Sequence, residues 1–160
     1  MPDSSLHSLP PHDPYEPPDP PPNDDGEADE EPYFCFTATL RIFGERLDLE
    51  EITRQMGLEP TGTHHKGDRR SERAQPYPHD MWRYEAPVDD DQPLAVHIDR
   101  LWADIRHAAP FLRELKQIAT VDIFLGYRSN WPVGQVPVPL ACLEMFVELD
   151  MSFGLSVIVM

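Results

Sequence analysis

Residues 33–58 read YFCFTATLRIFGERLDLEEITRQMGL, and this stretch decides the fold class of the chain. From Phe34 to Ile42, large apolar residues alternate with smaller or polar ones, which predicts a half-buried β-strand. A helix is then expected to begin after Asp48, because an aspartate at the N-cap with a glutamate three residues later forms a capping box. Gly57 stands where such a helix would end in a left-handed residue. A strand followed at once by a capped helix indicates a domain that mixes α and β elements.

The same two periodicities continue to the end of the chain. Alternation predicts strands near residues 61–66, 82–86, 121–125 and 153–159, and helical spacing predicts a long helical stretch over 93–117 and a third helix from Pro139. A straight helix over 93–117 would be about 37 Å long, so Pro110 is expected to break it. The third helix is expected to bury Leu140, Leu143, Phe146 and Val147. The last strand is apolar on both faces, which predicts a central or well-covered position.

The order of these elements predicts the fold. If residues 61–66 form a strand, the first six elements follow the order β-α-β-β-α-β, which is the split-βαβ or ferredoxin-like plan. We therefore predict an α+β fold with a ferredoxin-like core, an appended C-terminal helix and strand, and one sheet with helices on one face. Residues 33–160 are expected to form this single domain.

Residues 1–32 are expected to be a disordered, acidic, proline-rich tail. They contain ten prolines and few apolar residues, too few to offset the entropy of ordering the backbone. Three Pro-x-x-Pro spacings, at 11–14, 14–17 and 17–20, could make the tail a ligand of a proline-binding domain, although such ligands usually add a basic residue. The alternatives are a solubilising extension or a start codon assigned too far upstream.

The charge of the chain is unevenly divided. The formal net charge is −16; residues 1–32 contain ten acidic residues and no Lys or Arg, so residues 33–160 carry 19 acids against 13 bases and a net charge of −6. A negative surface repels phosphate, so neither nucleic acid nor an anionic membrane is an expected partner. A basic protein is the partner that this charge favours.

The cysteines and the apolar segments predict a compartment. Cys35 and Cys142 lie far apart and match no metal-binding spacing, so we expect free thiols in a reducing environment, with a disulfide as the alternative. The N-terminus lacks a basic segment followed by an apolar run, and no apolar stretch approaches the ~20 residues that span a bilayer. The chain is therefore predicted to be cytoplasmic, and no cofactor is expected.

Several short stretches together resemble one family. They are Arg41-Ile-Phe-Gly, Leu47 to Thr61 (LDLEEITRQMGLEPT), His65-Lys-Gly-Asp, Met81-Trp82 and Asp122-Ile-Phe-Leu-Gly, followed by the closing helix and strand. This combination resembles the bacterial domain of unknown function 4279 over residues 33–160. The family often has a glycine-rich turn before the third helix, where this chain has Trp131-Pro-Val-Gly-Gln. The resemblance implies a shared fold and brings no activity with it.

The densest polar cluster reads HHKGDRRSER over residues 64–73. Gly62 and Gly67 have the spacing of a phosphate-binding loop, but Asp68 stands where that loop requires lysine, which excludes it. His64 and His65 would point to opposite faces of a strand, so they cannot chelate a metal ion together, and no metal site is predicted.

The cluster could still bind an anion or an acidic partner, because four basic residues lie within eight positions. The residues of this candidate binding site are His65, Lys66, Arg69, Arg70, Arg73 and Trp82. The alternative is a solvated loop whose charges pair internally with Asp68 and Glu72, beside a tryptophan that belongs to the core. No serine, cysteine or threonine lies in a nucleophile motif, so no catalytic residue is predicted.

Two functions are favoured by this pattern, and a structural or assembly role is the remaining alternative. The first is a non-enzymatic protein-binding domain, similar to immunity proteins or antitoxins that mask a basic effector, and it is the main hypothesis. The second is an enzyme or ligand-binding domain that holds an anionic small molecule near the loop of residues 64–73.

Overall fold

The computed structural model describes residues 33–130 and 135–160. Along the chain, its elements are β1 (Phe34–Gly44), α1 (Leu49–Met56), β2 (Gly62–His64), β3 (Asp80–Glu85), α2 (Leu94–Ile105), the 3₁₀ turn η1 (Arg106–Ala108), α3 (Ala109–Leu115), β4 (Thr120–Ser129), the 3₁₀ turn η2 (Leu140–Leu143), α4 (Glu144–Glu148) and β5 (Leu155–Val159).

The five strands form one sheet in the order β2-β3-β1-β4-β5. The pairs β2–β3, β3–β1 and β1–β4 are antiparallel, and β5 pairs with β4 in parallel. The longest strand, β1, lies in the middle and shares ten aligned residues with β4, from Phe34 opposite Ser129 to Phe43 opposite Thr120. The prediction of an α+β fold is confirmed at this level, as a mixed fold around a single five-stranded sheet.

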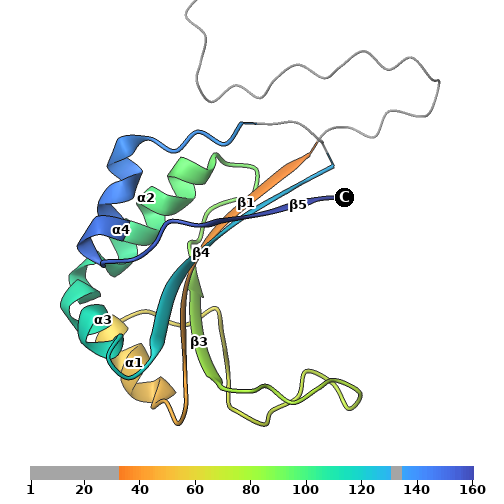
Figure 1. Ribbon diagram of the computed structural model, residues 1–160, viewed down its shortest axis with the longest axis vertical. Helices are drawn as coiled ribbons and strands as arrows, with labels where there is room; N and C mark the ends of the chain where they lie inside the picture. The colour runs from red at the N-terminus through yellow and green to blue at the C-terminus, as the bar shows by residue number, and fades with distance from the viewer. Residues whose placement is uncertain (1–32, 131–134) are drawn as a thin grey trace, which may run out of the picture.

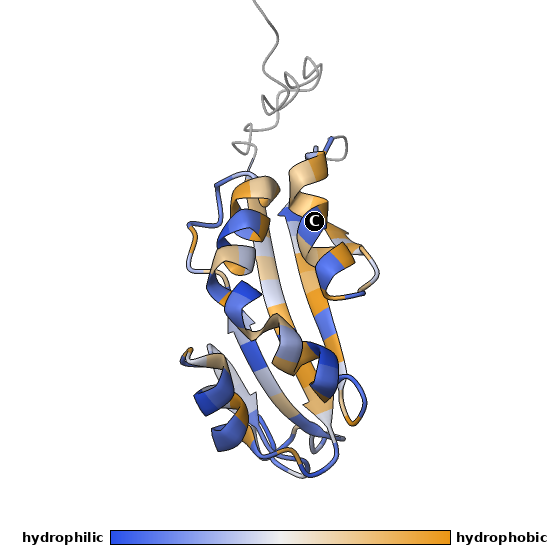
Figure 2. Ribbon diagram, turned by 90° about the vertical axis from the view of Figure 1, so that its left-hand side faces the viewer, coloured by the Kyte–Doolittle hydropathy of each residue, from blue (hydrophilic) through white to orange (hydrophobic). Residues whose placement is uncertain are grey.

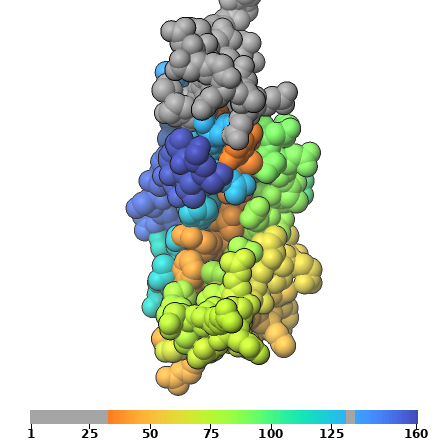
Figure 3. Space-filling view, turned by 90° about the vertical axis from the view of Figure 1, so that its right-hand side faces the viewer, coloured from red at the N-terminus to blue at the C-terminus, as the bar shows by residue number. Residues whose placement is uncertain are grey.

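The helices lie on one face of the sheet, and the strands are visible from the other side (Figures 1 and 3). The alternation in β1 explains this arrangement, because Ala38, Leu40 and Ile42 are fully buried toward the helices. The residues between them, such as Thr37 and Arg41, project from the opposite, open face. Seen from the helix side, apolar and polar residues alternate along both the helices and the strands (Figure 2).

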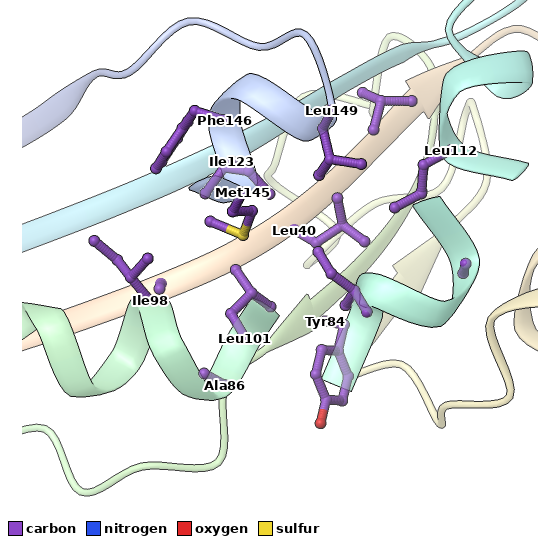
Figure 4. Packing of buried hydrophobic residues seen from close by; sticks show 14 of the residues in the cluster. Leu40, Tyr84, Ala86, Ile98, Leu101, Leu112, Ile123, Met145, Phe146 and Leu149 are labelled. Carbon is purple, nitrogen blue, oxygen red and sulfur yellow. The ribbon is translucent and has the colours of Figure 1, made fainter. Parts of the chain in front are cut away.

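The core fills the space between the sheet and the helices (Figure 4). Leu40 of β1 lies at its centre, between side chains of α2 and of the C-terminal helix α4. The largest fully buried side chains are Trp82, Leu40, Ile42, Met56, Leu94, Ile98, Leu101, Ile105, Leu112, Leu125, Met145 and Leu149. These side chains come from both the sheet and the helices, so one continuous core extends from α1 to α4.

Both predicted ends of the first helix are confirmed. The side chain of Asp48 accepts a hydrogen bond from the backbone N–H of Glu51, and Gly57 adopts a left-handed conformation at φ 60°. The capping box is only half formed, because the Glu51 carboxylate bonds to Arg54 and Gln55 within the helix. Local signals therefore set where this helix begins and ends.

The long helical stretch breaks as predicted, slightly before the proline. The chain leaves α2 after Ile105, forms η1, and starts α3 with Pro110 in its first turn. Proline has no N–H to donate and its ring clashes with the preceding turn, whereas the first turn of a helix tolerates it. The break changes the direction of the helix, and α3 continues beside the sheet toward the start of β4 (Figure 1).

The predicted buried face of the third helix is partly wrong. Leu140 and Val147 are 84% and 80% exposed, whereas Cys142 and Met145 are buried. The segment begins as the 3₁₀ turn η2, which has three residues per turn, so its apolar face is rotated relative to that of an α-helix.

The predicted central position of the last strand is also wrong. β5 lies at the edge of the sheet, and Val157, Ile158 and Val159 are about half exposed. Among the described strands it pairs only with β4, and its residues change from half-buried at Leu155 and Ser156 to exposed at Val157, Ile158 and Val159. A strand with apolar residues on both faces can therefore be a short edge strand, as it is here, and need not be a covered central strand.

Candidate functional site

The loop of residues 65–79, which connects β2 to β3, borders an open hollow at one end of the sheet. In the space-filling view of the open face, this loop projects at the lower end of the molecule (Figure 3). The hollow measures about 660 Å³ and is lined by Gly62, Thr63, His64, Asp68, Arg69, Arg70, Tyr77, Met81 and Arg83. We call it the arginine hollow, because three of these residues are arginines.

The backbone of the loop folds back on itself beside the hollow. The N–H of Gly67 donates to the carbonyl oxygen of Tyr77 at 2.9 Å, and the N–H of Tyr77 donates to that of Asp68 at 2.8 Å. Gly67 adopts φ 91°, a conformation that few residues other than glycine reach. As a result, the ring of Tyr77 stacks on the ring of His64, with centroids 3.6 Å apart.

A single buried carboxylate, that of Asp80, fastens the base of the loop. Its two oxygens accept hydrogen bonds from the backbone N–H groups of Leu47 and Lys66, each at 2.7 Å, and His65 Nδ1 lies 3.4 Å away. The hydrogen bonds from Lys66 and Leu47, and then the one from His65, hold the pKa of Asp80 below its usual range. Asp80 thereby joins the loop of residues 65–79 to the turn between β1 and α1.

Arg83 reaches the hollow because β2 has a glycine opposite it. Gly62 pairs with Arg83, and a Cβ placed on Gly62 would lie 2.7 Å from the Arg83 Nε. The guanidinium group therefore lies against the backbone of β2, in space that any other residue would fill.

The hollow has more positive than negative charge. Among residues 33–130 and 135–160, none of Arg69, Arg70 and Arg83 forms an ion pair. In the same ranges, the only side-chain hydrogen bond of Arg69 is a long one, 3.4 Å, to the backbone carbonyl oxygen of Ala74. Asp68 is the only acidic residue of the lining, and its carboxylate accepts from the backbone N–H of His65. Unpaired guanidinium groups around an open hollow provide donors for carboxylate or phosphate oxygens.

His64 adds a neutral wall to this hollow. Burial lowers its pKa most, and the nearby His79 and Arg83 lower it further, against a smaller opposite effect of Asp68 and Asp80. The imidazole is therefore mainly uncharged at neutral pH. The arginines carry the charge of the hollow, and the stacked His64 and Tyr77 rings provide a flat surface.

The structure places the six predicted site residues in different environments. Arg69 and Arg70 line the hollow, whereas Arg73 lies exposed outside it. Lys66 pairs with Glu45 at 2.8 Å, and His65 lies beside Asp80. The loop is thus held by Asp80 and Glu45 as well as by its internal bond to Asp68, and Glu72 takes part in no ion pair in the described part of the chain.

Trp82 does not belong to this surface. Its side chain is completely buried on the helix-covered face of β3, where its indole N–H donates to the Thr53 hydroxyl at 3.0 Å. Neighbouring residues of a strand point to opposite faces, so Trp82 and Arg83 cannot share a site. Its assignment to the binding site is corrected to a role in the core.

The predicted binding residues did not include Tyr77 and Arg83, and His64 belonged to the predicted cluster but was not named as a binding residue. The signal for Arg83 was available, because the alternation of Trp82 and Tyr84 toward the core places Arg83 on the open face. The stacking of Tyr77 on His64 depends on the turn at Gly67, which no periodic pattern indicates.

Residues 33–130 and 135–160 contain neither a metal-binding cluster nor a membrane-spanning helix. Within them, no group of three or more His, Cys, Asp or Glu residues is arranged to hold a metal ion, and no helix has the length and apolar character needed to cross a membrane. Cys35 and Cys142 are free thiols on opposite faces of the sheet, so the alternative of a disulfide is wrong.

Comparisons with known proteins agree with this description and add no activity. Neither the curated proteins nor the solved structures include a significant match to this chain. The model of one family, described as a domain of unknown function (DUF4279), matches residues 33–154, which include every element up to the start of β5. The chain therefore belongs to the DUF4279 family.

Proposed function

We propose that this chain is a non-enzymatic binding domain whose arginine hollow takes up an anionic group of its partner. The observation that carries the proposal is the gathering of Arg69, Arg70 and Arg83 around one hollow, with no ion-pair partner among the described residues. Guanidinium groups are the preferred donors for carboxylates and phosphates. The neutral His64 and the single Asp68 leave the hollow with a net positive charge.

A direct binding measurement tests this proposal. The probe is a fluorescein-labelled hexaglutamate peptide, titrated with the full chain at low ionic strength and followed by fluorescence anisotropy. We expect the variant Arg69→Gln/Arg70→Gln to bind the probe about tenfold more weakly, because each exposed charge pair contributes up to ~1 kcal/mol. Its melting temperature should change little, since both side chains are exposed.

The matched control is Arg54→Gln/Arg106→Gln, which removes two exposed arginines from the helices on the other face. This variant has the same net charge as the first, so it separates a local site from a general charge effect. Equal weakening in both variants would overturn the proposal.

A second candidate is the immunity- or antitoxin-like masking of a basic protein. The observation that favours it is an acidic region at the opposite end of β1, where Asp89, Asp90 and Asp91 are exposed. The carbonyl of Asp90 accepts from the N–H of Phe36, so this turn lies beside the point where the acidic residues 24–31 join the domain. Such a region would speed association with a cationic partner. Capture of a basic protein whose binding is lost in Asp89→Asn/Asp90→Asn/Asp91→Asn would support it.

Two further parts of the proposal concern fold type and location. The strand order β2-β3-β1-β4 with antiparallel neighbours, and the element order β-α-β-β-α-β, support a ferredoxin-like core to which η2, α4 and β5 are appended. The free thiols Cys35 and Cys142 support a reducing compartment such as the cytoplasm.

A further inference from the structure

We infer that the occupant of the arginine hollow is a segment of the same chain, residues 13–19, which read DPYEPPD. The inference rests on the proposed function and names the partner of that site. The segment lies outside the described residues, and it contains three acidic residues and no basic one. Its charge is therefore opposite to that of the hollow.

The acidic residues of this segment are spaced to match a row of donors. Asp13, Glu16 and Asp19 recur at every third position, with prolines at 14, 17, 18 and 20 between and beside them. Proline favours the polyproline II conformation, which has three residues per turn and rises 3.1 Å per residue. In that conformation the three carboxylates would project from one face, about 9 Å apart, at a low cost in entropy.

The hollow offers what such a segment needs. Arg69, Arg70 and Arg83 provide guanidinium donors, and the stacked rings of His64 and Tyr77 provide a flat aromatic surface. Proline-rich segments bind to aromatic-lined surfaces in many recognition domains. The combination of arginines with an aromatic wall fits an acidic, proline-rich occupant better than a small inorganic anion, which needs no aromatic surface.

The N-terminal segment contains two acidic groups, and the number of residues between each group and Tyr33 favours residues 13–19 as the occupant. The strand residues that line the hollow lie level with Arg41 to Phe43 of β1 and up to two strands to its side, about 28–35 Å from Tyr33 at ~3.3 Å per residue and ~4.8 Å per strand. Asp19 precedes Tyr33 by 14 residues, which span about 43 Å in polyproline II. The second acidic group, residues 24–31, starts only nine residues before Tyr33; fully extended, its first two residues would approach the near edge of the hollow, and the others fall short.

Covalent connection makes even a weak contact significant. A tethered ligand has an effective concentration in the millimolar range, so few charge pairs suffice to occupy the site. The segment would then compete with every acidic partner of the hollow, and the competition would weaken as salt screens the charges.

The contact can be measured in the full chain with a nitroxide spin label. The label is placed on His12→Cys in a Cys35→Ser background; Cys142 stays, because burial first and the hydrogen bond to Asp99 second raise its pKa to about 11, so that its thiol is unreactive at pH 7. We expect paramagnetic broadening of the amide signals of residues 62–70 at low salt. At about 0.5 M NaCl, where the screening length is ~4 Å, the broadening should disappear.

Two tail variants with the same charge change separate the contact from general attraction. Asp13→Asn/Glu16→Gln/Asp19→Asn should abolish the broadening, whereas Asp24→Asn/Asp25→Asn/Glu27→Gln should leave it. If the labelled chain with all its acidic residues intact shows no broadening, the inference is overturned. The same holds if both variants lose the broadening equally. Broadening of equal size between separately labelled molecules in a mixture also overturns it, because the segment would then bind another copy.

The hexaglutamate titration keeps the two proposals distinguishable. If the wild-type chain binds the peptide through Arg69 and Arg70 but shows no broadening, the inference about the segment fails and the proposed function stands. If the inference holds, Asp13→Asn/Glu16→Gln/Asp19→Asn should bind the peptide several-fold more tightly than the wild type does. Unchanged affinity in that variant counts against the segment as occupant.

Discussion

Asp80 shows how one side chain can organise the region around a candidate site. It is 4% exposed, and its carboxylate accepts backbone N–H groups from two segments that are 19 residues apart in the sequence, at Leu47 and Lys66. These donors would otherwise be left without a partner in a half-buried place, which is unfavourable. The arginine hollow therefore depends on a residue that does not line it.

The pH dependence of this contact can be predicted. Because the native pKa of Asp80 lies below its usual range, the unfolded chain takes up the proton first as the pH falls. The stabilisation is therefore complete above about pH 4, near the pKa of an unperturbed aspartate, and is lost as the pH falls through the native pKa. Asp80→Asn should lower the melting temperature by several degrees at pH 7 and reduce the difference between pH 5 and pH 2.5.

Thermal unfolding followed by circular dichroism at several pH values checks this prediction. Asp89→Asn serves as the control, because that side chain is exposed and makes no hydrogen bond within the described residues. If Asp80→Asn and Asp89→Asn unfold alike at pH 7, Asp80 does not hold the loop.

At the scale of elements, the edge position of β5 changes which substitutions the fold tolerates. β5 contributes five residues, and the side chains of its last three are about half exposed. The strand beside it, β4, instead buries Leu125 completely, opposite Leu155 in the pairing register. These two adjacent strands therefore differ greatly in how much apolar surface they remove from water.

This difference predicts unequal effects of mutation. Val157→Asp should change the free energy of unfolding by no more than about 1 kcal/mol, because the new carboxylate can remain in water. Leu125→Ala should lower it by about 2–5 kcal/mol, through lost burial and the cavity left behind. Urea denaturation of both variants at pH 7 measures the two effects; a larger loss for Val157→Asp would place β5 inside the core.

At the scale of the whole molecule, the charges are separated along β1. The basic loop and the arginine hollow lie at one end of the strand, and the exposed Asp89, Asp90 and Asp91 lie at the other. Both ends can therefore attract charged partners, of opposite sign, although the net charge is strongly negative.

The domain should fold without its N-terminal segment. Among the described residues, the buried core that connects α1 to α4 lies within 38–149, and removal of residues 1–32 deletes none of these side chains. We expect the melting temperature of a chain that starts at residue 33 to lie within a few degrees of the full chain, as measured by differential scanning calorimetry. Loss of cooperative unfolding would show that residues 1–32 belong to the domain.

Local chemistry in the sequence was sufficient to predict most elements. Asp48 and Gly57 mark the ends of α1, because a cap needs only atoms a few residues away. Pro110 marks the break in the long helix, since its missing N–H acts within one turn. The alternation in β1 also predicted its buried face, because the period of a strand is a property of the backbone alone.

The candidate site could be predicted only in part. The run of basic residues identified Arg69 and Arg70, but their meeting with Arg83 depends on the pairing of β2 with β3. Trp82 was assigned to the same site because it is close in sequence, and the pleat of β3 sends it to the opposite face. Trp82 follows the basic loop closely in the sequence, but closeness in sequence does not show which face of the sheet a side chain occupies.

The sequence by itself determined the kinds of element, the ends of α1, the break near Pro110 and the imbalance of charge. The tertiary structure alone decided that β5 lies at the edge, that Asp80 joins two loops and that three arginines surround one hollow. The physical reason is the range of the interactions. Caps, turns and periodicity act over one or two turns of chain, whereas strand order and side-chain gathering follow from pairing between segments tens of residues apart.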